Sequence, residues 1–468
     1  MGLSKFMILE EIKSPYDGAV QGEVPVATLN DIDQALIAAQ IGASQWRRTP
    51  AHIRSEILLK AASIAQSNVE ELALVICGET GKSISEARAE AARCAEIIRL
   101  SSFEGSHLYG NSLPLDANKG TGLDKIGFTL RQPVGIVVAI SPFNYPALLV
   151  LHKVAPALAV GNSVVLKPAR TTPLTALIIA KYFKEAGLPE NVLQVVTGSG
   201  ASLGDALVSD PRVRKVSFTG STATGKRISS ISGIKKLSLE LGSSCPVIVL
   251  DDADIEHATD SIAIGGYVNA GQVCISVQRV LVDKKILNDF LDALKPKVNA
   301  IKIGDPKKNE TNVGTLISEK EALRVEKSIS DAVKDGAKLL TGGERIGAMI
   351  KPAIVYDVNP KSSFAQEELF GPAVSVSTFN GLTESLALAN DSIYGLGAGI
   401  FTKNINSAIH AARELDVGNI HINWTPLWRA DLMPYGGLKS SGVGKEGIRS
   451  TVAEMTEEKT IILHGQPW

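Results

Sequence analysis

The sequence predicts an α/β fold built on two parallel sheets that helices cover on both faces. Short runs of β-branched, apolar residues alternate with helical stretches from about residue 134 onward. The alternation pauses near residues 240–250 and then resumes, and a chain of 468 residues is too long for one ordinary core. We therefore expect two α/β units that meet near residues 240–250.

Each predicted element follows from a local pattern. Residues 30–105 are expected to be helical because Ala, Glu, Arg and Leu dominate at helical spacing, with an N-cap region at Asn30–Asp31. Strands are expected at 134–140, 163–166, 192–196, 213–218, 246–250, 280–282 and 397–402. Helices are expected near 152–159, 173–186, 203–208 and 285–300. Two further strands, at 129–131 and 459–463, are expected outside both sheets.

The composition excludes several classes of protein. A net charge of −1 gives no basic surplus, so no nucleic-acid partner is expected. The longest apolar runs are too short to span a bilayer, and no signal peptide precedes them, so no membrane partner is expected. The four cysteines, Cys77, Cys94, Cys245 and Cys274, lack metal-ligand spacing. We expect no metal site and a cytoplasmic protein.

Cys274 and Glu240 form the first candidate pair for chemistry. Cys274 lies among small and uncharged residues at 269–276, where a carbonyl compound could reach the thiol. A carboxylate such as Glu240 beside it could take up protons, which suggests covalent catalysis through a thiohemiacetal or thioester. The alternative is a buried cysteine that only packs, and the segment alone leaves both interpretations open.

A glycine turn is expected where the strand at 213–218 runs into a helix. Gly220, Ser221 and Gly225 there offer backbone N–H groups at a helix start, which suits a phosphate. The spacing nearly matches a P-loop, but Arg227 replaces the hydroxyl residue that would hold magnesium. A dinucleotide pyrophosphate site is the favoured interpretation, and a plain tight turn is the alternative.

A second glycine motif, at 442–447, matches G-x-G-x-x-G. No strand precedes it, and the chain ends before an acidic residue could follow at the required distance. We therefore predict a flexible loop there and no dinucleotide fingerprint.

Polar residues also follow two predicted strand ends, where ligands gather in open α/β sheets. Lys167 could reach ribose hydroxyls and Arg170 suits a 2′-phosphate, with a solvated pair of surface charges as the alternative. Asn144 offers an N–H donor for an oxyanion, with a simple turn residue as the alternative.

Together these segments resemble the aldehyde dehydrogenase superfamily, and the resemblance spans nearly the whole chain. The matching blocks, in family order, are 141–146, 156–162, 166–169, 217–221, 239–242, 271–274, 367–372 and 434–439. The resemblance implies a Rossmann-like cofactor domain (1–116 and 134–243), an α/β catalytic domain (244–440) and a β-strand oligomerisation arm (117–133 and 441–468). A homodimer or homotetramer is therefore expected.

The resemblance also implies roles for named residues. Cys274 is the expected nucleophile, Asn144 with the Cys274 N–H is expected to stabilise the oxyanion, and Glu240 is expected to activate the water that hydrolyses the thioester. The expected cofactor-binding residues are Lys167 and Glu368 at the riboses, Gly220, Ser221 and Gly225 at the pyrophosphate, and Phe370 beside the nicotinamide.

Arg170 stands where many members of the family carry an acidic residue. A carboxylate there would repel a 2′-phosphate, whereas arginine attracts it. We expect NADP to be favoured, with NAD also accepted.

The substrate is expected to be a short polar aldehyde, which is oxidised to its carboxylic acid. Trp428 and Arg429 precede the 434–439 block, and the sequence of this segment is similar to that of lactaldehyde, glyceraldehyde and phosphonoacetaldehyde dehydrogenases. Arg429 could bind an anionic group of the substrate. The alternative for Arg429 is a salt bridge or interface. One rival substrate is succinate semialdehyde. Another is a phosphorylated triose, which would make the protein a non-phosphorylating glyceraldehyde-3-phosphate dehydrogenase. A CoA-acylating enzyme is disfavoured by Glu240, and a catalytically silent structural relative is the remote alternative.

Overall fold

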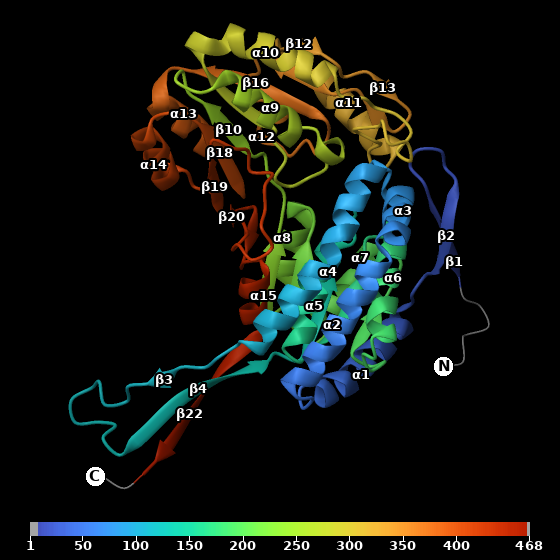
Figure 1. Ribbon diagram of the computed structural model, residues 1–468, viewed down its shortest axis with the longest axis vertical. Coiled ribbons are helices and arrows are strands. Elements are labelled where there is room, and N and C mark those ends of the chain that lie inside the picture. The colour runs from blue at the N-terminus through green and yellow to red at the C-terminus, as the bar shows by residue number, and fades with distance from the viewer. Residues whose placement is uncertain (1–7, 466–468) are drawn as a thin grey trace.

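The computed structural model describes residues 8–465 and contains two large sheets with an extended arm beside them (Figure 1). The first sheet has six strands, and all neighbours in it are parallel except the pair formed by its first two strands. Its order is β21 (Gly442–Val443), β9 (Lys236–Glu240), β8 (Val213–Thr219), β5 (Ile136–Ile140), β6 (Ser163–Lys167) and β7 (Leu193–Val195).

The N-terminal helices confirm the helical prediction for residues 30–105. They are α1 (Leu29–Trp46), α2 (Ala51–Ser67), α3 (Val69–Thr80) and α4 (Ile84–Ser106). The N-cap residue of the first of them is Thr28, two residues before the predicted cap region. Thr28 accepts the Asp31 N–H, and the Asp31 side chain accepts the Thr28 N–H, which forms a capping box.

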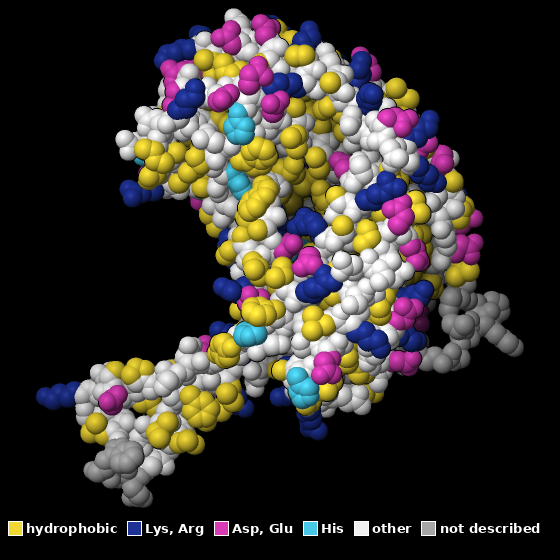
Figure 2. All heavy atoms as spheres, viewed as in Figure 1, with side chains coloured by type: hydrophobic (Ala, Val, Ile, Leu, Met, Phe, Trp, Pro, Cys, Tyr) yellow, Lys and Arg dark blue, Asp and Glu magenta, His cyan; other side chains and the backbone are white. Residues whose placement is uncertain are grey.

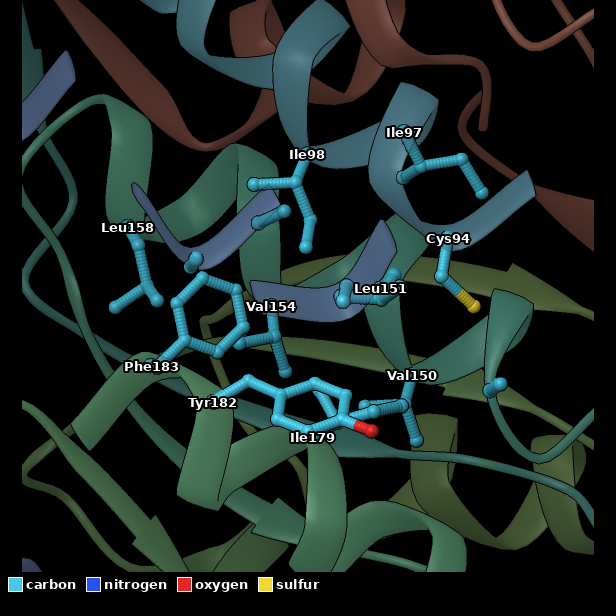
Figure 3. Packing of buried hydrophobic residues seen from close by; sticks show 14 of the residues in the cluster. Cys94, Ile97, Ile98, Val150, Leu151, Val154, Leu158, Ile179, Tyr182 and Phe183 are labelled. Carbon is cyan, nitrogen blue, oxygen red and sulfur yellow. The ribbon is translucent and has the colours of Figure 1, made fainter. Parts of the chain in front are cut away.

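Apolar residues on both faces of this sheet form the first core. On one face, α4 packs against α5 (Leu148–Ala159), and α6 (Pro173–Glu185) packs against α2 and α3; Val154 of α5 lies between Ile98 and Phe183 in this core (Figure 3). On the other face, α1 packs with α7 (Gly200–Ser209) and α8 (Thr222–Ile231). Each fully buried apolar side chain of this kind contributes about 1.5–3 kcal/mol to stability.

The second sheet has seven strands, of which only the first pair is antiparallel. Its order is β12 (Lys338–Thr341), β15 (Ala353–Tyr356), β16 (Ala373–Phe379), β11 (Arg279–Asp283), β10 (Pro246–Val249), β18 (Gly397–Phe401) and β19 (Asn419–Ile422). One face carries α9 (Ile255–Gly265), α10 (Leu287–Asn299) and α11 (Glu319–Lys334). The other carries α13 (Gly381–Asn390) and α14 (Ile405–Glu414).

Short elements complete the chain. They are β1 (Leu9–Lys13), β2 (Val20–Pro25), the 3₁₀ turns η1 (Val268–Gly271) and η2 (Lys284–Ile286), β13 (Arg345–Ile346), β14 (Met349–Ile350), α12 (Ser363–Gln366), β17 (Tyr394–Gly395), β20 (Leu438–Lys439) and α15 (Ile448–Glu454). Among residues 8–465, no helix has the length and apolar character needed to cross a membrane. The same residues contain no group of His, Cys, Asp and Glu that could hold a metal ion, and all four cysteines are free thiols.

The arm is an antiparallel sheet of three strands that extends from the first unit (Figure 1). It consists of β3 (Ser112–Leu113), β4 (Lys125–Pro133) and β22 (Thr456–His464). The pairing of β4 with β22 confirms the two strands predicted outside both sheets. Apolar side chains gather on the arm in Figure 2, and the exposed ones include Ile126, Leu130 and Leu463.

The prediction of a flexible loop at 442–447 was wrong. Gly442 pairs with Glu240 through β21 and β9, so this segment closes the edge of the first sheet. Glu446 and Tyr435 exchange backbone hydrogen bonds of 2.6 and 2.7 Å. A glycine-rich composition indicated mobility, but pairing with a distant strand fixes the backbone. The predicted domain limits stay predictions, and residues 442–443 belong to the six-stranded sheet.

Candidate active site

Two cavities meet at Cys274. The larger has a volume of about 550 Å³ and the smaller about 90 Å³. Asn144, Leu149 and Cys274 line both of them. A thiol and an amide therefore lie at the junction between a space large enough for an extended ligand and a space for a small one.

The Cys274 thiol is held at the end of an unusual turn. Asn269 and Ala270 have φ angles of 52° and 54°, which residues with a side chain rarely adopt. Beyond this turn the Cys274 Sγ atom lies 3.1 Å from the Tyr435 hydroxyl. Burial raises the pKa of the Cys274 thiol to about 12, and the hydrogen bond with Tyr435 opposes that rise. The thiol is therefore protonated near neutral pH in this state.

Asn144 is fixed beside the thiol by the same loop. Its Nδ2 atom donates to the Gln272 carbonyl over 2.8 Å, and its Oδ1 atom accepts from the Tyr145 N–H over 3.1 Å. An amide nitrogen has two hydrogens, so one remains for a ligand in the cavities. Asn144 can therefore supply a donor to an oxygen atom that is bound next to Cys274.

Glu240 ends β9 and is buried against Gly436. A Cβ atom at Gly436 would lie 2.8 Å from the Glu240 Oε1 atom, so only glycine leaves room for this carboxyl. Among the described residues, neither Glu240 oxygen has a hydrogen-bond partner, and Glu240 lines neither cavity. Burial and the nearby Glu446 charge raise the pKa of Glu240 well above its ordinary value. Once ionised, such a carboxyl is a strong base.

Glu446 is the ionised partner in this pair of carboxyls. Its Oε2 atom lies 2.9 Å from the Lys153 Nζ atom, and its Oε1 atom lies 2.9 Å from Arg429 Nη2. Burial acts to raise the pKa of Glu446, but the charges of Lys153 and Arg429 hold it well below the ordinary value. Glu446 therefore stays ionised, and its charge favours the protonated form of Glu240.

The start of α8 forms one wall of the larger cavity. Gly220, Ser221 and Thr224 line it, and the Ser221 hydroxyl caps the helix by accepting the Thr224 N–H over 3.3 Å. Free backbone N–H groups and the helix dipole at this position suit a phosphate group.

Glu368 and Phe370 form another part of the same wall. Glu368 accepts the Ser243 N–H over 3.0 Å, and burial raises the pKa of Glu368 to about 7. Phe370 has a φ angle of 49°, and its ring meets the edge of the Phe143 ring with centroids 5.8 Å apart. Together these residues offer a carboxyl for hydroxyl groups and an apolar surface for a flat ring.

Two predicted cofactor residues lie outside this lining, although the intervening Ala169 belongs to it. Lys167 is buried, and its Nζ atom donates to the Pro168 carbonyl over 3.1 Å. Arg170 is exposed, and its Nε atom donates to the Glu10 carboxylate over 2.5 Å. The guanidinium is therefore already paired with a residue of β1.

Gly225 and Trp428 also lie outside both linings in the part of the chain that the structure describes. Gly225 is buried within α8, where a Cβ atom would lie 2.4 Å from the Leu241 side chain. Trp428 is 58% exposed, and its ring meets the His421 ring at 6.4 Å. Gly225 thus serves close packing of a helix, and Trp428 faces outward.

The smaller cavity is lined by Arg93, His152 and Arg429. Asp431 lies 2.5 Å from Arg93 Nη2 and 3.3 Å from His152 Nε2. Burial acts to raise the pKa of Asp431, but His152 and Arg93 hold it below its ordinary value. Burial and the Arg429 charge lower the pKa of His152, so this imidazole is neutral.

This arrangement leaves one unpaired acceptor and one unpaired donor at the smaller cavity. Because Nε2 of the neutral His152 donates to an ionised Asp431, its Nδ1 atom must be an acceptor. Neither that Nδ1 atom nor the Nε–H of Arg429 has a partner among residues 8–465. The cavity therefore suits a small ligand with both a hydroxyl and an acceptor or anionic group.

Sequence reasoning missed Arg93 and His152 as site residues. The signal for Arg93 was available, because it shares a stripe of α4 with the buried residues Glu90 and Ile97. A charged residue on the buried stripe of a helix is uncommon unless it has a partner. His152 offered no such signal, since its helix is buried on nearly every side.

Comparison with known proteins shows what the chain is similar to. The family model described as aldehyde dehydrogenase family matches residues 9–461. A 3-sulfolactaldehyde dehydrogenase of Priestia aryabhattai is 43% identical over 97% of this chain and 94% of its own. A lactaldehyde dehydrogenase of Methanococcus aeolicus is 39% identical over 97% of each chain. The structure of an NADP-dependent glyceraldehyde-3-phosphate dehydrogenase from Bacillus halodurans, complexed with NADP, has a TM-score of 0.96 at 36% identity, covering 98% of this chain and 96% of that one.

Proposed function

Because the chain belongs to the aldehyde dehydrogenase family, we propose that it oxidises a short polar aldehyde to its carboxylic acid through Cys274, with NADP favoured as hydride acceptor. The observation that carries this proposal is the junction of two cavities at Cys274 and Asn144. The smaller cavity would hold the aldehyde, and the larger would hold the dinucleotide with a phosphate at the start of α8.

The proposed reaction begins with attack of the Cys274 sulfur on the aldehyde carbon. The thiol must first lose its proton to water, because burial raises the pKa of Cys274 and keeps the thiol protonated. Asn144 Nδ2 and the Cys274 N–H would donate to the developing oxyanion. Bound NADP supplies the hydride acceptor, and loss of hydride from the thiohemiacetal leaves a thioester on Cys274. Glu240 would then take a proton from the water that hydrolyses it.

We assign the adenosine end of the cofactor to the neighbourhood of Arg170, and replacing Arg170 by glutamine is expected to test this. A 2′-phosphate would compete with Glu10 for the guanidinium, and a hydrogen bond to a charged group contributes about 1.5–3 kcal/mol. We expect kcat/KM for NADP to fall about tenfold or more, with the value for NAD changed less than about threefold.

The control is Arg413→Gln, which removes an exposed arginine from α14 on the outer face of the second sheet. Steady-state kinetics with both cofactors would measure the ratio of kcat/KM for NADP to kcat/KM for NAD. An NADP to NAD ratio that is the same in Arg170→Gln and in the control would contradict the assignment.

The proposed substrate has three or four carbons, a hydroxyl next to the aldehyde and an anionic end group. The acceptor Nδ1 of His152 suits the hydroxyl, and the donors of Arg429 and Arg93 suit the anion. A cavity of about 90 Å³ limits the chain length. The name of one relative, 3-sulfolactaldehyde dehydrogenase, supports a substrate with both groups, and the name of the other, lactaldehyde dehydrogenase, supports the hydroxyl next to the aldehyde.

Replacing Arg93 by glutamine is expected to separate anionic from neutral aldehydes. We expect KM for 3-sulfolactaldehyde to rise about tenfold or more and KM for lactaldehyde to change less than about threefold, because only the anion meets the guanidinium. Arg99→Gln is the matched control, since Arg99 lies on the same helix and faces Glu96 at the surface. Equal changes for both aldehydes would contradict the proposed anion site.

A phosphorylated triose is the second candidate substrate, because the two arginines also fit a phosphate. Succinate semialdehyde fits less well, since it has no hydroxyl for the His152 acceptor. Glyceraldehyde 3-phosphate and succinate semialdehyde therefore belong in the same kinetic comparison, and the highest kcat/KM with Arg93 intact decides among them.

We also propose a cytoplasmic homodimer or homotetramer that assembles through the arm. The exposed apolar residues Ile126, Leu130, Ile462 and Leu463 on β4 and β22 support assembly, because burying them removes apolar surface from water. Four free thiols support a reducing compartment. A monomeric mass by light scattering would contradict the proposed assembly.

A further inference from the structure

We propose that Glu86 and Glu90 of α4 are positioning residues that hold the segments of Cys274 and Asn144 in the arrangement that the reaction requires. The inference rests on the proposed function, because it assumes that these two residues act on one substrate. Glu86 and Glu90 are four residues apart, so both carboxylates project from the same face of α4.

Glu86 contacts the turn that leads to Cys274. Its Oε1 atom accepts the Asn269 N–H over 2.7 Å, and its Oε2 atom accepts the Ser83 hydroxyl over 3.1 Å. Asn269 and Ala270 are left-handed residues with side chains, a conformation that persists only where surrounding contacts enforce it. Glu86 provides such a contact at the first residue of the turn.

Hydrogen bonds also connect this turn to Asn144 and to the segment of Cys274. The Asn269 Nδ2 atom donates to the Asn144 carbonyl over 3.1 Å, and the Gln272 side chain donates to the Asn269 carbonyl over 3.1 Å. The Asn144 side chain donates to the Gln272 carbonyl, two residues before Cys274. The oxyanion donor and the nucleophile therefore belong to one hydrogen-bonded unit, which Glu86 fastens to α4.

Glu90 anchors the other half of this unit. Its Oε1 atom accepts the N–H groups of Ala147 and Leu148 over 2.9 and 3.2 Å, at the start of α5. Its Oε2 atom pairs with Lys82 over 2.5 Å, and neither of these side chains is exposed. The Lys82 ammonium lies 3.7 Å from the centroid of the Tyr145 ring, next to Asn144. Both catalytic segments are thus fixed to one rigid helix.

Glu79 provides a matched structural comparison. It is buried and accepts the N–H groups of Leu174 and Thr175 over 2.9 and 3.1 Å at the start of α6, much as Glu90 does for α5. Its carboxylate contacts a helix that bears neither Cys274 nor Asn144. Removing it is expected to lower stability without moving the reacting groups.

Glu86→Ala is the test. We expect kcat to fall about 100-fold with KM for the aldehyde changed less than about threefold, because small displacements of reacting groups have effects of this size. Alkylation of Cys274 by iodoacetamide, measured by peptide mass spectrometry, should become faster at pH 8. The midpoint of its rate against pH should move to lower pH. A loosened turn would expose a thiol that burial otherwise keeps protonated.

Two further variants separate positioning from general damage. Glu86→Gln keeps an acceptor oxygen at the same distance and is expected to restore kcat to within about threefold of the natural protein. Glu79→Ala is expected to lower the unfolding temperature while kcat and the alkylation profile stay within about threefold. If Glu86→Ala does not fold, Glu86→Asp shortens the reach by one methylene and must show the same fall in kcat and the same faster alkylation.

A folded Glu86→Ala protein with unchanged kcat and unchanged alkylation would overturn the inference. So would a Glu79→Ala protein whose kcat falls as far as that of Glu86→Ala. If the natural protein oxidises no aldehyde, the proposed function fails, but the alkylation profiles of Glu86→Ala and Glu79→Ala still decide whether Glu86 holds the Cys274 turn.

Discussion

Replacing Cys274 by alanine is expected to lower kcat at least about 10⁴-fold, because the variant has no sulfur on which a thiohemiacetal can form. Neighbouring groups cannot substitute for it, since the other three thiols are buried and none of them lines either cavity. Reduction of NADP at 340 nm would measure activity. The unfolding temperature would show that the fold is retained.

Cys77→Ala is the control for loss of a thiol as such. Cys77 lies in α3 within the first apolar core and is remote in sequence from the site. We expect this variant to keep kcat within about threefold, with a modest loss of stability from the small cavity that is created. The covalent mechanism fails if Cys274→Ala retains more than about a hundredth of the natural activity.

Replacing Glu240 by glutamine is expected to stop the reaction after the first half. Each site should form one NADPH in a rapid burst, after which the steady rate falls about 10²- to 10⁴-fold, because no base remains to activate water. Stopped-flow absorbance would measure the burst. The control is Glu104→Gln, a buried carboxylate at the end of α4 that pairs with Arg449.

The pH dependence follows from the same carboxyl. Burial and the Glu446 charge raise the pKa of Glu240, so at low pH the group is protonated and cannot accept a proton. We expect kcat of the natural protein to rise as pH increases through that raised pKa. The residual rate of Glu240→Gln should lack this rise, and a burst-free Glu240→Gln with a normal pH profile would contradict the assignment of the base.

The sequence indicated seven strands of the two large sheets because their signal is local, and it missed β9, β12, β15, β16, β19 and β21. The strand at 136–140 is buried on both faces and reads as an uninterrupted apolar run, which is typical of the centre of a parallel sheet. The helix at 287–299 was predicted near residues 285–300, and its buried residues lie along one face. The observed ends of some elements differ from the predicted ends by a few residues, as at α1, which begins after the N-cap residue Thr28.

Contacts between segments that are distant in the sequence could not be predicted from it. The turn at 442–447 was expected to be mobile, and only its pairing with β9 fixes it. Arg170 was assigned to the cofactor from its place after a strand, but nothing in the sequence indicates that Glu10 pairs with it. Arg93 enters the smaller cavity from a helix far away in sequence, and its neighbours there were not predictable from spacing.

The most direct measurement of the covalent mechanism is the mass of the Cys274 peptide from Glu240→Gln protein that has been mixed with NADP and 3-sulfolactaldehyde or lactaldehyde. The account predicts a peptide that is heavier by the mass of the aldehyde minus two hydrogens, which is the thioester left after loss of hydride. NADPH formation with an unmodified Cys274 peptide, or with the acyl group on another residue, would contradict it.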